Sequence, residues 1–286
     1  MKKILLSVCL FLLIVCYVDG QDTNLEKADS LYKCGKHFEA SVWYERGLFE
    51  GETSPEICMQ AVKGKINCLK LQLRFAEELD FINRSRNLDI PDSFRQHLAY
   101  DELLANYLSG RFVNTIEDAK NLDRGLFSFE ERKTAKLITI LSYNELCRWN
   151  QADSAYKEYL ATYLNNAVSK EQLGLYLKKP TLKSEHKARV LSNLFPGLGQ
   201  VYAGKSVEGI TNLLLQLGTL WFSAGAWQEG YHLTSLLIGG SSFSAFRSGG
   251  KRRAVNLIKK ENAKNIDKYN DYLRKQLLLS YTLKTL

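Results

Sequence analysis

The stretch Gly35-Lys36-His37-Phe38-Glu39-Ala40 decides the fold, because its pattern returns three more times along the chain. Residues equivalent to Gly35 are separated by 38, 37 and 37 positions: Gly35, Leu73, Gly110 and Cys147. The residues two positions later keep the same separations: His37, Phe75, Phe112 and Trp149. The residues five positions after the first set are Ala40, Glu78, Thr115 and Ala152. A fixed period of this length predicts an array of structural repeats.

Each repeat is predicted to be a pair of helices. Pro55 follows Ser54 and Pro91 precedes Asp92, which are signals for a helix start. The segment Ser128-Phe129-Glu130-Glu131 has the spacing of a capping box. Between these starts, apolar residues recur at intervals of three and four, as on one face of a helix. Residues 21–180 are therefore expected to form about four helical hairpins.

This pattern resembles the tetratricopeptide repeat family. The residues that carry the resemblance are Gly35 and Gly110 at the turn, Phe75, Phe112 and Trp149 two positions on, then Ala40 and Ala152, and finally Tyr44 and Tyr156. A small residue lets the two helices approach closely, and aromatic residues fill the groove between neighbouring hairpins. The resemblance implies a solenoid that binds extended peptides or partner helices without catalysis. Glu78 departs from the pattern, and a generic helical bundle is the alternative.

Residues 1–20 read as a secretory signal peptide. Lys2 and Lys3 precede an uncharged apolar run, and Gly20 fits a cleavage position. Acylation at Cys16 and an uncleaved anchor are the alternatives. Removal of the signal peptide on export leaves four cysteines: Cys34, Cys58, Cys68 and Cys147. We expect them to be buried inside helices as small apolar residues. An exported protein can also form disulfides, and the sequence leaves their disulfide status open. Their spacing does not suit a metal site.

Residues 181–286 contain two apolar stretches. Ile210 to Gln228 has no Asp, Glu, Lys, Arg or His, and His232 is the only one of these residue types from Gly230 to Phe246. We predict a membrane hairpin with spans at about 209–228 and 231–247, since each approaches bilayer thickness as a helix. A single span, or a hairpin buried in a soluble, secreted repeat adaptor, is the alternative.

Directly before the hairpin stands a pattern rich in glycine, P-G-x-G-Q-x-Y-x-G-x-x-x-x-G, formed by Pro196, Gly197, Gly199, Gln200, Tyr202, Gly204 and Gly209. It resembles a motif of small proteins with a two-transmembrane hairpin, and the C-terminal region of exported repeat proteins of unknown function in bacterial envelopes. The resemblance implies an architecture and no activity. We expect Pro196 to end a helix, the glycines to allow a sharp re-entry, and Gln200 and Tyr202 to lie at head-group level.

The same stretch, Gly199 to Ser206, satisfies the phosphate-binding loop pattern G-x-x-x-x-G-K-[ST]. A phosphate-binding loop needs a strand before it and an aspartate for magnesium elsewhere. The aspartates after Ser206, Asp267 and Asp271, lie in a polar tail. A nucleotide-dependent enzyme is therefore the disfavoured alternative, and we predict no catalytic, cofactor-binding or metal-binding residues.

The net charge of +8 is concentrated at the C-terminal end, where residues 247–286 hold 11 basic and 3 acidic residues. Lys251-Arg252-Arg253 opens this basic amphipathic tail helix. Such a helix is typical of segments that lie on an anionic membrane surface. The alternative is a solvent-exposed helix that caps the hairpin. Nucleic acid is disfavoured as a partner because the chain is expected to be exported.

The sequence as a whole predicts an all-α protein: a tetratricopeptide-like solenoid, then a membrane hairpin and a basic tail helix. We expect a non-catalytic, membrane-anchored scaffold of the bacterial envelope with its repeats in the periplasm. The expected partners are membrane lipid and an unidentified envelope protein, with no small-molecule substrate and no cofactor. A transport role is disfavoured, since the two apolar stretches offer no charged pathway.

Overall fold

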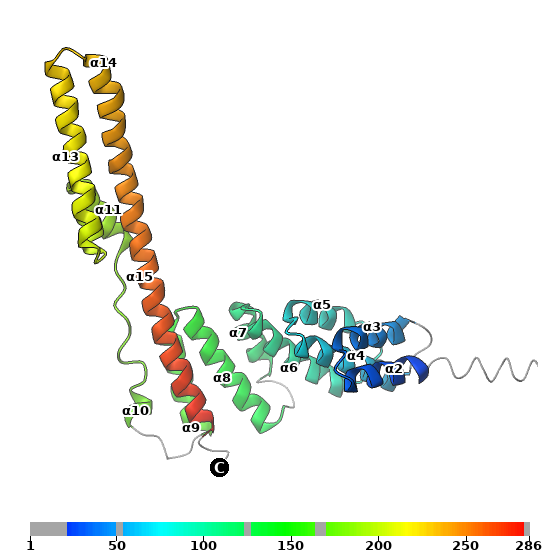
Figure 1. Ribbon diagram of the computed structural model, residues 1–286. Coiled ribbons are helices and arrows are strands. Elements are labelled where there is room, and N and C mark those ends of the chain that lie inside the picture. Colours follow the sequence, from blue (N-terminus) through cyan, green and yellow to red (C-terminus); the bar gives the residue numbers. More distant parts are fainter. Residues whose placement is uncertain (1–21, 50–53, 123–126, 164–169, 283–286) are drawn as a thin grey trace, which may run out of the picture. The chain divides into compact units, whose positions relative to one another are not determined.

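The structure is a computed structural model that describes residues 22–49, 54–122, 127–163 and 170–282 (Figure 1). Within these ranges the chain forms helices and turns and contains no strand, which confirms the all-α prediction. The predicted signal segment, 1–20, lies outside them. The chain divides into two compact units, Met1–Gly174 and Leu175–Leu286, so the division falls six residues before the predicted one.

The first unit is built from helices that pack on their neighbours in the chain. Contacts join α2 to α3, α3 to α4, and so on through α8 and α9. The helices are α2 (Asp22–Lys33), α3 (His37–Phe49), α4 (Pro55–Leu71), α5 (Phe75–Ser85), α6 (Asp92–Leu108), α7 (Phe112–Leu122), α8 (Phe129–Glu145), α9 (Trp149–Tyr163) and the short α10 (Lys170–Leu173). Two of the predicted starts are capped by side chains: Ser54 caps α4, and Ser128 forms a capping box with Glu131.

Four aligned residues sit at the turns inside these helix pairs and share one backbone conformation. Each has a positive φ of 56–75°: Gly35, Leu73, Gly110 and Cys147. Each N–H donates to the carbonyl three residues back, and the next N–H donates to the carbonyl five residues back, at 2.8–3.0 Å. This is the Schellman ending of a helix, which glycine adopts most easily. Leu73 and Cys147 adopt it despite their side chains.

The two later sets of aligned residues also have structural roles. His37, Phe75, Phe112 and Trp149 are the first residues of α3, α5, α7 and α9. The set three residues further on is fully buried: Ala40, Glu78, Thr115 and Ala152. The predicted period therefore matches four equivalent helix–turn–helix units.

The aromatic residues at the helix starts are only half buried, in contrast to their expected place between hairpins. The Phe112 ring lies 5.7 Å from the ring of Tyr107, in the last turn of the preceding helix. Tyr44 and Tyr156, by contrast, are buried. A close contact explains Tyr44: an added Cβ on Gly64 would come within 2.4 Å of its ring.

The cysteines divide into two kinds. Cys58 and Cys68 are buried within α4, as expected of small apolar residues. Cys34 and Cys147 are exposed and lie in the turns, so the expectation of burial inside helices is wrong for this pair.

The second unit is a helical hairpin on a base of short helices. Its elements are α11 (Glu185–Leu194), α12 (Leu198–Tyr202), α13 (Ser206–Gln228), α14 (His232–Thr234), a π-helical turn η1 (Ser235–Gly240) and α15 (Ser241–Thr282). The arm that pairs with α13 is η1 continued by the first part of α15. Since α15 runs for 42 residues, the second arm and the basic tail are one continuous helix.

No helix within the described ranges combines the length and apolar character needed to cross a membrane. The two spans predicted at 209–228 and 231–247 are therefore not found. Polar residues within α13, such as Asn212 and Gln216, and charges in α15 from Arg247 onward lower their apolar character.

Candidate functional site

The glycine-rich motif holds the base of the hairpin together. Gly197 has a φ of +87° at the start of α12 and touches α13: an added Cβ would lie 2.1 Å from the carbonyl oxygen of Gly209. At Gly199 an added Cβ would lie 1.9 Å from Ser192 Oγ and 2.8 Å from Ala254 Cβ. These glycines therefore allow α11, α12, α13 and α15 to meet at van der Waals distance.

The two polar residues of the motif point into this base. Gln200 is 1% exposed, and its Nε2 donates to the Gly250 carbonyl at 3.2 Å. The Tyr202 hydroxyl accepts from the Ser184 amide at 3.2 Å, and the Tyr202 ring packs beside Ala188 and Ile258. The expected position at head-group level therefore does not describe Gln200, which links two helices inside the unit.

The phosphate-loop pattern has a different conformation here. Gly204 has a φ of +88°, and its N–H donates to the Val201 carbonyl at 2.9 Å. The Lys205 N–H donates to the Gln200 carbonyl at 2.9 Å, and Ser206 opens α13. These bonds repeat the turn at Gly35, so amide groups that would cradle a phosphate are already used. Gly204-Lys205-Ser206 is a helix-ending turn, and in the described residues helices rather than a strand precede it.

The predicted basic surface lies at the same base. Arg253 forms two hydrogen bonds with Glu208 of α13, at 2.8 and 3.1 Å. These bonds lower the pKa of the Glu208 carboxyl and raise the pKa of the Arg253 guanidinium. Arg252 is exposed, Lys251 is half-buried, and Arg247 donates to the Asn193 carbonyl at 3.0 Å.

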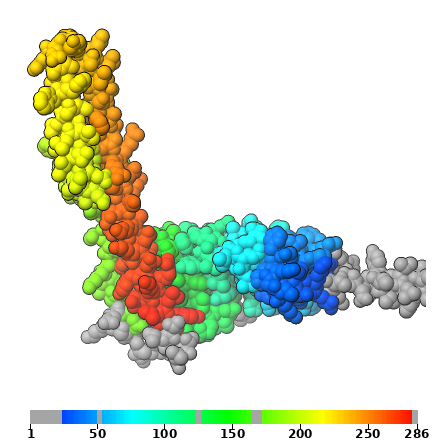
Figure 2. Space-filling model, viewed as in Figure 1, coloured from blue at the N-terminus to red at the C-terminus, as the bar shows by residue number. Residues whose placement is uncertain are grey.

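Along the hairpin, polar side chains face inward and apolar side chains face outward. Gln216 is buried and donates to Asn212 at 2.6 Å, while Ser223 and Ser235 join α13 to η1 through hydroxyl bonds of 2.7–3.1 Å. Most of the large exposed side chains of both arms are apolar; the arms are the yellow and orange segments in Figure 2. The apolar ones include Ile210, Leu214, Leu217, Phe222, Leu233, Leu236, Leu237, Ile238 and Trp221, which is 81% exposed. Within the second unit, no described segment covers these side chains.

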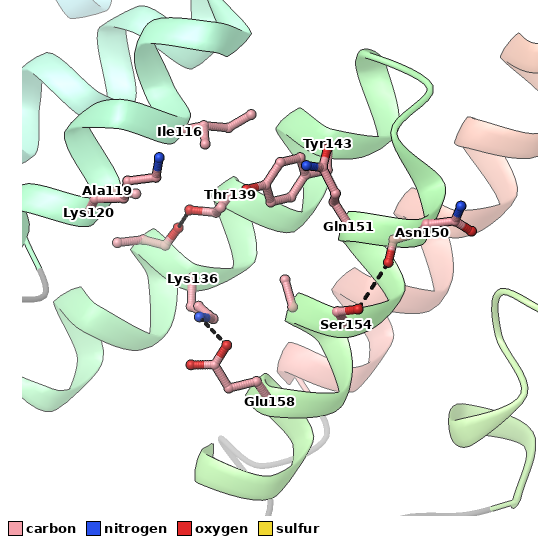
Figure 3. Close-up of a pocket in the computed structure, with 12 residues that line it drawn as sticks. Ile116, Ala119, Lys120, Lys136, Thr139, Tyr143, Asn150, Gln151, Ser154 and Glu158 are labelled. Atoms are coloured by element: carbon pink, nitrogen blue, oxygen red, sulfur yellow. Dashed lines mark hydrogen bonds and ion pairs between the residues drawn. The ribbon is translucent and has the colours of Figure 1, made fainter.

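The first unit contains a groove of about 510 Å³ between α7, α8 and α9 (Figure 3). Its apolar lining comes from Ile116, Ala119, Ala135 and Ala155. Polar side chains border it, and Lys136 pairs with Glu158 at 2.7 Å. The repeat pattern does not identify this groove, because its residues differ from the ones that the repeats share.

Nothing in the described ranges forms a cluster of three metal-ligating side chains. A comparison with known protein families finds no match, and no curated protein is significantly similar to the chain.

Proposed function

We propose that this protein is a non-catalytic scaffold of the bacterial cell envelope. In this proposal the chain is exported, its first unit binds an envelope protein in the periplasm, and its second unit holds it on a lipid membrane. The proposal assigns it neither a small-molecule substrate nor a cofactor.

The proposed attachment to a membrane rests on α13, which buries a polar side chain and exposes apolar ones. A helix on a water-soluble domain buries its apolar face and exposes its polar face. In α13 the buried side chain is Gln216, whereas Leu214 is 62% and Trp221 81% exposed. In lipid, by contrast, polar side chains turn toward the partner helix and small residues permit close packing. An apolar surface of this extent favours attachment to lipid.

The repeated turn geometry supports the scaffold part. Four equivalent turns, each followed by a buried residue five positions later, are consistent with a tetratricopeptide-like array. Such arrays present long surfaces to other proteins. The groove over α8 is our candidate contact region, because it combines a small apolar floor with polar borders.

Flotation of the full chain with lipid vesicles tests the attachment. We expect the unmodified protein to float with the vesicles and to stay there at high salt, because apolar contacts are not screened. A Leu217→Glu, Trp221→Glu variant should lose most of its binding.

Leu177→Glu is the matched control, since Leu177 is an exposed leucine of the second unit outside the hairpin. It should float like the unmodified chain. The attachment proposal fails if all three proteins stay in the bottom fraction, or if the hairpin variant floats as well as the control.

A further inference from the structure

We propose that the groove along α13 and α15 binds one membrane phospholipid with an anionic, hydroxyl-bearing head group. The inference rests on the proposed attachment to lipid and adds a defined site to it. The head group would occupy a polar cavity at the base of the hairpin, and one acyl chain would follow the helices away from it.

The head-group end is a cavity of about 380 Å³ between α12, α13 and α15. Its polar lining comes from Gln200, Asn212, Glu208 and Arg253, and its apolar lining from Val207, Leu215 and Phe246. Cavities of several hundred Å³ with a few polar groups are typical of small-ligand sites.

One buried acceptor in this lining lacks a partner. Gln200 donates through Nε2 to Gly250, but its Oε1 has no hydrogen bond in the described structure. Gln200 is 1% exposed, so this oxygen is cut off from bulk water. A buried polar atom left unpaired is costly, and a donor from a ligand would satisfy it. Gln200 lines the cavity, so a hydroxyl group of a lipid head supplies such a donor when the amide turns toward it.

The charge around the cavity favours a phosphate. Arg253 lines the cavity and pairs with Glu208. In the sequence, Arg252, Lys251 and Lys205 stand one or two positions from a lining residue. Glu208 accepts two hydrogen bonds from Arg253, and a guanidinium has five N–H donors, so donors remain for a phosphate. Basic pockets beside apolar helices suit anionic lipid heads.

The acyl-chain end is a second groove of about 400 Å³ that continues the first. The two share Thr211, Leu215 and Phe246. The second is lined further along by Leu214, Phe222 and Ile238, with Gly218 and Gly239 leaving room. From Val207 to Phe222 the helix rises about 22 Å, so the combined groove matches an amphiphile: polar at the base, apolar toward the tip.

Binding of phosphatidylglycerol to the full chain in a non-ionic detergent tests the site by native mass spectrometry. We expect saturable binding of one molecule per chain. Phosphatidylcholine with the same acyl chains, which lacks hydroxyl donors and net charge, should bind about tenfold more weakly.

Gly249→Leu should weaken phosphatidylglycerol binding by about tenfold or more. Gly249 lines the cavity, and an added Cβ meets no atom within 4 Å, so the larger side chain enters the cavity without a clash at its base. Gly240→Leu is the control, because Gly240 is equally unhindered and lies outside both grooves. Circular dichroism checks that both variants keep their helices.

Equal affinity for the two lipids, or an unchanged affinity of Gly249→Leu, would overturn the site. The proposed attachment has a separate readout, because Gly249→Leu keeps the outward apolar side chains and should still float with vesicles. Flotation without selective lipid binding would refute only the site, whereas loss of flotation by the unmodified chain would refute the attachment.

Discussion

Replacing Glu78 should change how stability depends on pH. Glu78 is fully buried in α5, at the position where the other repeats have Ala40, Thr115 and Ala152. Neither of its carboxylate oxygens has a hydrogen bond, and Lys70 Nζ lies 3.8 Å from Oε1. Burial raises the pKa of Glu78 from its ordinary 4.5 to about 7; Lys70 lowers it in part, and Asp101 raises it.

The sign follows from proton linkage. Between pH 4.5 and 7 the folded chain holds a proton on Glu78 that the unfolded chain releases. The free energy of unfolding therefore falls by about 3 kcal/mol in total as the pH rises from 4.5 to 7. Above pH 7 the destabilisation by Glu78 stays constant. Below pH 4.5 both states are protonated and the penalty disappears.

Glu78→Gln removes this titration and keeps the shape of the side chain. At pH 8 the variant should be more stable than the unmodified chain by up to about 3 kcal/mol, with little difference near pH 4.5. Urea unfolding of the full chain, followed by circular dichroism at several pH values, measures the difference. Glu77→Gln, at the exposed neighbouring position, should keep the pH slope of the unmodified chain. Identical slopes for Glu78→Gln and the unmodified chain would show that the Glu78 carboxyl is solvated.

Four further substitutions test the turns and the packing, and Gly240→Ala serves as a control. Leu73→Gly should raise the free energy of unfolding by about 0.5–1 kcal/mol, because glycine tolerates the positive φ. Gly110→Ala should lower it by about 1 kcal/mol for the same reason. A loss of stability in Leu73→Gly and a gain in Gly110→Ala, measured by urea unfolding, would contradict the turn geometry. Gly199→Ala should destabilise the second unit by about 1–3 kcal/mol through its clash with Ser192, seen as faster proteolysis of residues 175–286, while Gly240→Ala should not. Trp149→Ala should cost less than the roughly 3–5 kcal/mol of a fully buried tryptophan, because Trp149 is half buried; a cost within that range would contradict its position.

The repeat register could be predicted because its causes are local. A residue with positive φ, a helix start two positions on and a buried residue five positions on are fixed within six residues of sequence. The same turn recurs at Gly204 and Gly230 in the second unit. At Gly204 it produced the phosphate-loop pattern, since a glycine followed by lysine and serine suits both structures. Local sequence could not separate them, whereas the backbone hydrogen bonds do.

The candidate sites could not be predicted because they depend on contacts between distant residues. Gln200 is buried, and it donates to the carbonyl of Gly250, fifty positions away in the sequence. Gly249-Gly250 looks like a helix breaker, yet α15 runs through it. Gly250 lies against α13, where an added Cβ would come within 2.0 Å of Asn212 Nδ2. Tertiary packing thus outweighs the low helix propensity of glycine and joins the second arm to the basic tail.

The attachment of the hairpin to lipid is tested most directly at Trp221. A chain in which Trp43, Trp149 and Trp227 are replaced by Phe reports only Trp221, which is 81% exposed. Adding vesicles whose acyl chains carry bromine should shift the Trp221 emission to shorter wavelength and quench it strongly, because the ring enters the hydrocarbon region. Emission that stays that of a tryptophan in water, without quenching, would contradict the account.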